Sequence, residues 1–79
     1  MEKQIKHSEE YKQIGRNIGK LRRKKKLSQE ELANKVGISF SYLSQIEAPN
    51  VVKKMSLEVL FDLASALDVD VKDLLKKAE

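Results

Sequence analysis

The side chains whose types and spacing best suit recognition chemistry lie between Ser39 and Gln45. Ser41 and Gln45 are four residues apart, a spacing that places two side chains on one face of a helix. Serine hydroxyls and a glutamine amide both donate and accept hydrogen bonds, so they can pair with the edges of nucleic-acid bases. The expected base-reading residues are Ser39, Phe40, Ser41, Ser44 and Gln45.

Gln45 is the strongest candidate in this group, because its amide can pair with adenine through a donor and an acceptor together. The alternative is that Gln45 is an ordinary solvated helix residue. Phe40 is also open to two interpretations: it could press on a thymine methyl group, or it could pack back against the preceding turn.

Residues that usually carry catalysis or bind metals are isolated in this chain. His7 is the only histidine, and it lacks a partner for general-base, triad or metal-ligand chemistry. The chain has no cysteine, which excludes disulfides, thiolate chemistry and zinc fingers. No Gly-rich phosphate loop is present. We therefore expect a protein that is not an enzyme and that has no metal or cofactor.

The elements that must position residues 39–45 are two short helices joined by a turn. The first is expected from about Gln29 to Val36, with Ser28 and Glu31 forming a capping box. Gly37 can end it in the left-handed region without a Cβ penalty. A second helix follows from Phe40 to about Glu47 with Ser39 as its cap, which is the spacing of a helix-turn-helix.

Three further helices complete the expected all-α fold. They run from Ser8 to about Lys25, from a Ser56 cap to about Leu67, and from an Asp70 cap through Val71 to about Lys77. The expected inward-facing residues are Tyr11, Ile14, Ile18 and Leu21 in the first of these and Leu57, Leu60, Phe61, Ala64 and Leu67 in the second. In the last helix, Leu74 and Leu75 are expected to face inward. Residues 1–7 are expected to be a flexible arm, and 8–79 one domain.

Charge is distributed unevenly along the 79 residues. Residues 1–27 contain ten Lys or Arg and three Glu, whereas residues 28–79 contain six Lys and nine acidic residues. A basic segment beside a polar helix suits phosphate contact, although the run 22–26 could equally be a solvated helix end. No apolar run is long enough to span a membrane, and the first residues lack the apolar region of a secretion signal, so we expect a cytoplasmic protein.

Three phrases in the chain resemble the XRE family of lambda-repressor-like helix-turn-helix proteins. They are Ile14-Gly15-Arg16-Asn17-Ile18, the segment from Gln29 to Glu47 with its Gly37-Ile38-Ser39 turn, and Leu63-Ala64-Ser65-Ala66-Leu67-Asp68-Val69. The resemblance covers roughly residues 11–75. It implies a compact five-helix domain in a transcriptional regulator, such as a repressor, that reads double-stranded DNA in the major groove with residues 39–47.

The resemblance also implies roles for individual residues. Gln29 matches a glutamine that clamps a DNA phosphate, and Arg22 and Glu47 match a structural ion pair; the alternative is that both charges are solvated. Lys53 and Lys54 are reasonable phosphate binders by charge. The full set expected at DNA phosphates is Gln29, Lys35, Tyr42, Asn50, Lys53 and Lys54. For Tyr42 the alternative is a half-buried packing role.

The loop after Glu47 departs from the family pattern. Pro49 stands where glycine is common, and the loop through Met55 is about two residues longer than usual. Pro49 should stop the preceding helix, because the residue before a proline avoids the helical region. Backbone contacts that the family makes from this loop therefore transfer poorly to this chain.

Self-association is the last expectation. Related domains associate through their last helix, and Val59, Leu63, Val71 and Leu75 add more apolar surface than one small core needs. We expect a homodimer on a palindromic operator, with no small-molecule effector. The alternative function is an antitoxin-type or other protein-binding helical module whose main partner is a protein.

Overall fold

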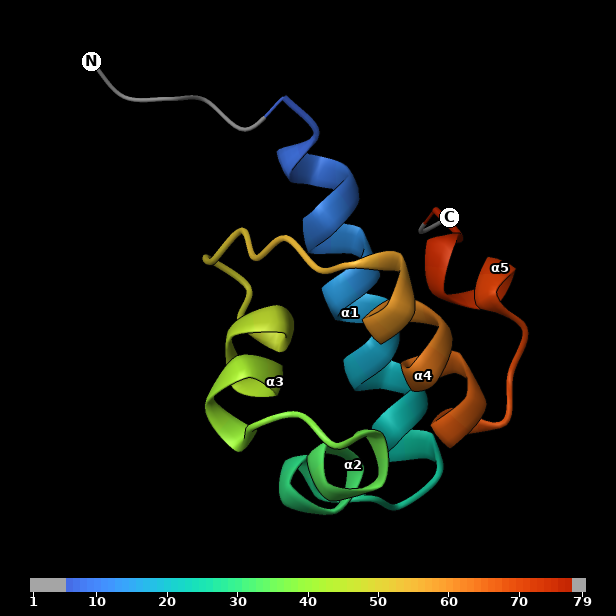
Figure 1. Ribbon diagram of the computed structural model, residues 1–79. Coiled ribbons are helices and arrows are strands. Elements are labelled where there is room, and N and C mark those ends of the chain that lie inside the picture. Colours follow the sequence, from blue (N-terminus) through green and yellow to red (C-terminus); the bar gives the residue numbers. More distant parts are fainter. Residues whose placement is uncertain (1–5, 78–79) are drawn as a thin grey trace.

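The computed structural model describes residues 6–77, which fold into five α-helices (Figure 1). The helices are α1 (Ser8–Lys24), α2 (Gln29–Val36), α3 (Phe40–Glu47), α4 (Leu57–Leu67) and α5 (Val71–Leu75). The predicted all-α, five-helix architecture is confirmed. Of the arm expected at residues 1–7, the structure describes only Lys6 and His7, which form a turn before α1. The rest of the expected arm lies outside the described residues.

Local capping explains the limits of α2. The Ser28 hydroxyl accepts a hydrogen bond from the Glu31 backbone N–H at 3.0 Å, and the Ser28 backbone N–H donates to Glu31 Oε1 at 2.8 Å. This second bond lowers the pKa of the exposed Glu31 carboxyl below its ordinary value, because it stabilises the ionised form. At the other end Gly37 has φ +83°, the left-handed conformation predicted for it.

The helices pack with α1 at the centre of the arrangement. α1 contacts α3, α4 and α5, while α2 packs between α3 and α4. In Figure 1, α3 and α5 lie on opposite sides of α1. The helix-turn-helix, α2 and α3, is therefore one flank of the fold, and the α4–α5 region is the other.

None of the helices within residues 6–77 is both long enough and apolar enough to cross a membrane.

The core corrects the predicted faces of α4. The buried apolar side chains are Ile18, Leu32, Ala33, Leu43, Ile46, Leu60, Leu63, Ala64, Leu67 and Leu74. Leu57 and Phe61, expected inside, are exposed, whereas Leu63, expected outside the core stripe, is fully buried. The reason is that α4 is covered from several sides, by α1, α2 and α5, so its buried face is centred nearer Leu63 than the spacing alone indicated.

The last helix is also shorter than predicted. α5 ends at Leu75 rather than near Lys77, and the Asp70 side chain makes no capping hydrogen bond. Leu75, expected to face inward, is half exposed, while Leu74 is buried as predicted. The carbonyls at this end are bound from α1 instead: Asn17 Nδ2 donates to the Leu74 oxygen at 2.9 Å and to the Lys76 oxygen at 2.8 Å. A tertiary contact therefore closes a helix too short to be stable alone.

Candidate nucleic-acid interface

The outer face of α3 presents a polar surface that carries no charge. Leu43 and Ile46 are buried against the other helices, which turns Ser41 and Gln45 outward, where both are exposed. Ser44 is only partly exposed. The predicted limits of α3 and its Ser39 cap are confirmed, because the Ser39 hydroxyl accepts the Tyr42 backbone N–H at 3.0 Å.

The other two candidate base-reading residues sit at the start of this helix. Ser39 is exposed, but its hydroxyl oxygen already serves as the cap acceptor. Phe40 leaves about half of its surface exposed. The exposed half of its surface is available to a ligand beside α3, while the rest is covered by the protein, so this exposure fits both interpretations of Phe40. All five candidates thus lie on α3 or at its cap, on the side turned away from the core.

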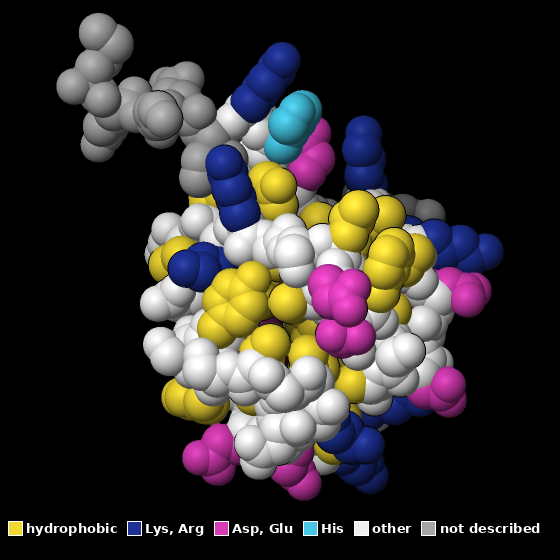
Figure 2. Space-filling model, viewed as in Figure 1, with side chains coloured by type: hydrophobic (Ala, Val, Ile, Leu, Met, Phe, Trp, Pro, Cys, Tyr) yellow, Lys and Arg dark blue, Asp and Glu magenta, His cyan; other side chains and the backbone are white. Residues whose placement is uncertain are grey.

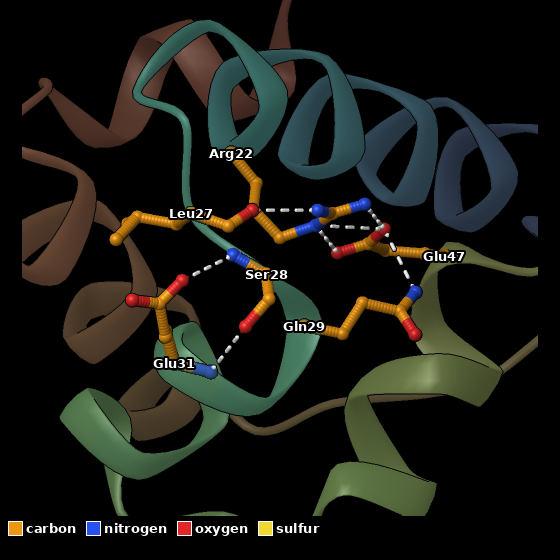
Figure 3. Close-up of polar contacts among 6 residues, drawn as sticks. All are labelled: Arg22, Leu27, Ser28, Gln29, Glu31 and Glu47. Carbon is orange, nitrogen blue, oxygen red and sulfur yellow. Dashed lines mark hydrogen bonds and ion pairs between the residues drawn. The ribbon is translucent and has the colours of Figure 1, made fainter.

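An ion pair fixes the end of α3 against α1 (Figure 3). Arg22 Nε donates to Glu47 Oε2 at 2.9 Å, and Arg22 Nη2 donates to Glu47 Oε1 at 3.0 Å. Only 12% of the Arg22 side chain and 6% of the Glu47 side chain are exposed. Arg22 Nη1 also donates to the Leu27 carbonyl at 2.7 Å. The expected pair is present, and its bidentate geometry with little solvent exposure orients both side chains firmly.

Gln29 joins this pair, which the sequence did not indicate. Its Nε2 donates to Glu47 Oε1 at 3.0 Å, so Glu47 binds α1 and the first residue of α2 at once (Figure 3). Eighteen positions separate Gln29 from Glu47, and the type of neither residue signals the contact. The consequence is that the amide expected to clamp a phosphate is already oriented in the free protein.

Two glycines allow α1 to lie unusually close to the end of α3. A Cβ atom at Gly15 would collide with the backbone carbonyl oxygen of Ile46. At Gly19 a Cβ atom would meet Glu47 Oε1 at 3.1 Å and Arg23 Nη1 at 3.2 Å, which are ends of side chains rather than backbone. The close packing therefore requires glycine at position 15, whereas at position 19 the neighbouring side-chain ends could shift to admit a methyl group.

The loop between α3 and α4 is attached to α3 through Tyr42. Its hydroxyl donates to the Lys54 carbonyl at 3.3 Å, and Lys53 Nζ lies 5.5 Å from the centre of its ring. Tyr42 is partly buried, so the structure favours its packing role over a free phosphate contact. Lys54 and Asn50 remain exposed on the same loop.

Lys35 lies apart from the other residues expected at phosphates. It borders a surface depression with Val36 of α2 and with three residues of α4, namely Asp62, Ser65 and Ala66. No α3 residue lines this depression. The structure therefore does not bring Lys35 together with Gln29 and the residues of the loop.

A second exposed surface, on the other flank, is apolar. Leu57, Phe61 and Leu75 are 68%, 52% and 51% exposed, and hydrophobic side chains gather over the start of α4 and over α5 in Figure 2. We call these three residues the α4–α5 patch. Val59 and Val71, expected in a dimer contact, are partly buried against the core. Leu63 was also expected there, but it is fully buried and offers no surface to a partner.

Comparison with known proteins gives matches over most of the chain. Residues 18–74 match the family described as Helix-turn-helix. The chain is 42% identical over 62 residues to the HTH-type transcriptional regulator SinR of Bacillus subtilis, an alignment that covers 78% of this chain and 55% of SinR. The chain spans 55 to 59% of the length of the two curated SinR relatives it matches.

Two solved structures illustrate the similarity of the fold. The restriction-modification controller protein C.AhdI from Aeromonas hydrophila is similar with a TM-score of 0.75 and 34% identity, covering 81% of this chain and 94% of C.AhdI. The master regulator for biofilm formation SinR, in complex with DNA, is similar with a TM-score of 0.73 and 41% identity, covering 80% of this chain and 98% of that one.

Proposed function

The chain belongs to the XRE-type helix-turn-helix family, and from this premise we propose that it is a sequence-specific transcriptional regulator that binds double-stranded DNA. In this role α3 enters the major groove and its outward side chains contact base edges. SinR, which is similar over most of this chain, has been solved in complex with DNA, and this supports the same ligand here.

One observation carries the proposal: a short helix with an uncharged polar outer face is fixed at its end by an ion pair that is little exposed to solvent. An eight-residue helix is marginal in water on its own, so its position depends on Leu43, Ile46 and the Glu47–Arg22 pair. Exposed hydroxyl and amide groups on such a fixed helix suit base recognition, which needs directed donors and acceptors. The base-reading residues are then Ser39, Phe40, Ser41, Ser44 and Gln45.

The DNA backbone is bound on either side of this helix. Gln29, oriented by Glu47, provides an amide at the amino end of α2, where backbone N–H groups also favour an anion. Asn50, Lys53 and Lys54 supply polar and cationic groups from the loop after α3. Tyr42 supports this loop, and Lys35, which lies beside α4, is left out of the phosphate set.

The regulator acts as a homodimer on a palindromic operator. The α4–α5 patch exposes three large apolar side chains, and Val71 of α5 adds a partly covered fourth. In Figure 1 α5 lies on the opposite side of α1 from α3, and α4 lies in front of α1. Pairing through the patch on α4 and α5 would therefore leave both recognition helices free. A two-fold dimer would contact half-sites one helical turn apart, about 34–36 Å, or a multiple of it.

Selection of bound sequences from random duplexes tests the base-reading assignment. The wild type should enrich a defined sequence, and Gln45→Ala should lose the preference at one base pair in each half-site, because a bidentate contact discriminates by about 1–3 kcal/mol. Ser65→Ala, at an exposed position of α4, is the matched control and should select the wild-type sequence. Identical selections by wild type and Gln45→Ala would show that Gln45 is only a solvated helix residue.

A further inference from the structure

We propose that α1 carries a separate DNA-backbone surface made of Arg16, Lys20 and Arg23, which we call the α1 stripe. It would hold phosphates of the strand that passes the carboxyl end of α3, outside the base pairs that α3 reads. The inference rests on the proposed function. It assigns a role in DNA binding to α1, a helix that had none in the proposal above.

The spacing and position of the α1 stripe carry the inference. The three residues follow at intervals of four and three, which aligns them along one face of α1, and all three are exposed. Together with Glu47 and Pro49 they line a groove between α1 and the carboxyl end of α3. The stripe is therefore an exposed cationic surface of α1 beside the end of the recognition helix.

The groove has a fixed geometry because its floor is a close helix contact. Gly15 and Gly19, which also line it, let the α1 backbone approach the last residues of α3. The Arg22–Glu47 pair joins the two helices at the same place. A ligand that positions α3 therefore positions the α1 stripe as well.

The positive charge of the stripe is available to a ligand. Within residues 6–77, ion pairs involve His7, Lys12 and Arg22, and none involves a residue of the stripe. Arg16 donates only to the neutral Gln13 side chain, at 3.1 Å. The one carboxylate of the groove, Glu47, is already bound by Arg22 and Gln29. Three cations beside a neutralised carboxylate favour an anionic partner.

The dimensions of DNA indicate which anion this is. A helix of eight residues is about 12 Å long, and the major groove is about 12 Å wide. For a helix that lies across the groove, groups just beyond its end therefore meet phosphates rather than base edges. The α1 stripe lies beyond the carboxyl end of α3, so it meets the strand at that side.

The test compares the salt dependence of binding to the selected operator. In Arg16→Gln/Lys20→Gln/Arg23→Gln, the slope of log K against log salt should become shallower by about 2 to 3 for each bound protomer, or by about 5 for a dimer on a palindromic operator, since each lost phosphate contact is worth about 0.9. The preferred sequence should stay that of the wild type. A control with equal charge loss, Lys24→Gln/Lys72→Gln/Lys76→Gln, removes exposed cations outside the groove and should keep the wild-type slope.

The outcomes separate the two proposals. If the wild type binds its operator and the stripe variant has the same slope, the α1 stripe is not a backbone contact, while the proposed function stands. An equal reduction in the control variant would also overturn the stripe, because the effect would be one of net charge. If the wild type shows no binding to duplex DNA, the proposed function fails and the stripe fails with it. Unchanged thermal unfolding of the stripe variant would show that a change in slope does not come from misfolding.

Discussion

Glu47 is the residue on which most of the interface depends. It accepts hydrogen bonds from Arg22 and from Gln29, so one nearly buried carboxylate connects α1, α2 and α3. The cost of removing this carboxylate from water is offset by hydrogen bonds from the Arg22 guanidinium and the Gln29 amide. Removing the carboxylate would leave the Arg22 charge without its counter-ion. Glu47 is therefore needed both for the fold and for the orientation of Gln29.

Glu47→Ala should lower the free energy of unfolding by about 3 kcal/mol, because the Arg22 guanidinium is left largely buried without its counter-ion. Urea denaturation monitored by circular dichroism measures this. Glu58→Ala is the control: Glu58 is exposed, it is in no ion pair within residues 6–77, and its replacement should change the free energy by less than about 0.5 kcal/mol. Equal midpoints for wild type and Glu47→Ala would mean that the pair adds nothing to stability.

Lys26 is a residue whose type conflicts with its conformation. Its φ is +60° at the turn after α1, where the Leu27 N–H donates to the Arg22 carbonyl at 3.1 Å. The left-handed conformation costs an L-residue roughly 1–2 kcal/mol, a cost that glycine avoids. This turn leads directly into the Ser28 cap of α2, so its strain bears on the helix-turn-helix.

Lys26→Gly should raise the free energy of unfolding by about 1 kcal/mol by relieving this strain. Lys26→Gln is the matched control, since it removes the same charge but keeps a Cβ atom in the left-handed region. A denaturation series should therefore rank the glycine variant above both the glutamine variant and the wild type. If glycine and glutamine raised stability equally, the gain would come from the lost charge in the basic run and not from the backbone.

Among the elements, the contact between α1 and α3 sets the position of the recognition helix. The α1 backbone lies against the carbonyl of Ile46, and Gly15 is the residue that makes this possible. A larger residue would push the end of α3 outward and with it Glu47. The contact therefore couples helix packing directly to the geometry of the DNA-facing side.

Gly15→Ala should destabilise the fold by about 3 kcal/mol, near the upper end of the range for overpacked sites, because the added methyl meets backbone that cannot rotate away. Gly19→Ala should cost less, since the ends of Glu47 and Arg23 can move by a few tenths of an ångström. The intrinsic helix preference for alanine, about 1 kcal/mol, acts equally at both sites. Thermal unfolding of the two variants side by side gives the difference. A Gly15→Ala variant more stable than Gly19→Ala would refute the close contact.

The limits of α2 and α3 could be predicted from the sequence because their signals are local. Ser28 and Glu31, Gly37, and Ser39 each act on backbone groups within four residues, and all were observed as expected. The buried face of α4 and the end of α5 depend on what packs against them. Leu63 is covered by neighbouring helices, and α5 is closed by Asn17, which lies 57 residues before Leu74. Spacing within one helix carries no such information.

The same distinction applies to the candidate site. The Arg22–Glu47 pair could be anticipated only through family resemblance, since residue types 25 positions apart do not identify each other. The Gln29–Glu47 bond and the Tyr42–Lys54 bond were not anticipated, because they depend on how α2 and the loop lie against α3. Outward-facing residues of α3 follow from helical periodicity once Leu43 and Ile46 are placed inside.

At the scale of the whole molecule, two surfaces of different chemistry lie on opposite flanks. The outer face of α3 exposes Ser41 and Gln45, and a groove lined by the cationic α1 stripe lies beside its carboxyl end. The α4 and α5 side exposes the apolar α4–α5 patch, where hydrophobic side chains gather in Figure 2. With Leu63 in the core, the exposed residues of the patch replace it as the expected dimer contacts. Under the proposed function, this separation would let one domain bind DNA and a second copy at the same time.

The dimer proposal predicts the behaviour of patch variants. Leu75→Lys and Phe61→Lys each place a charge where an apolar side chain would be buried, so each should raise the dimer dissociation constant by at least about tenfold, given about 1.5–3 kcal/mol for a buried large side chain. Val51→Lys is the matched control, because Val51 is an exposed apolar residue in the loop after α3, outside the patch. Sedimentation equilibrium should show loss of dimer in the patch variants only.

Binding to DNA should change in the same variants in a specific way. A protein that pairs through the α4–α5 patch gains affinity for two half-sites over one by making the second contact intramolecular. Leu75→Lys should therefore lose most of its preference for a palindromic duplex over a duplex with one half-site, while its affinity for the single half-site stays near that of the wild type. A wild type that sediments as a monomer at high micromolar concentration, both free and on the palindrome, would refute the dimer. A Leu75→Lys variant that stays dimeric would instead place the dimer contact elsewhere on the molecule.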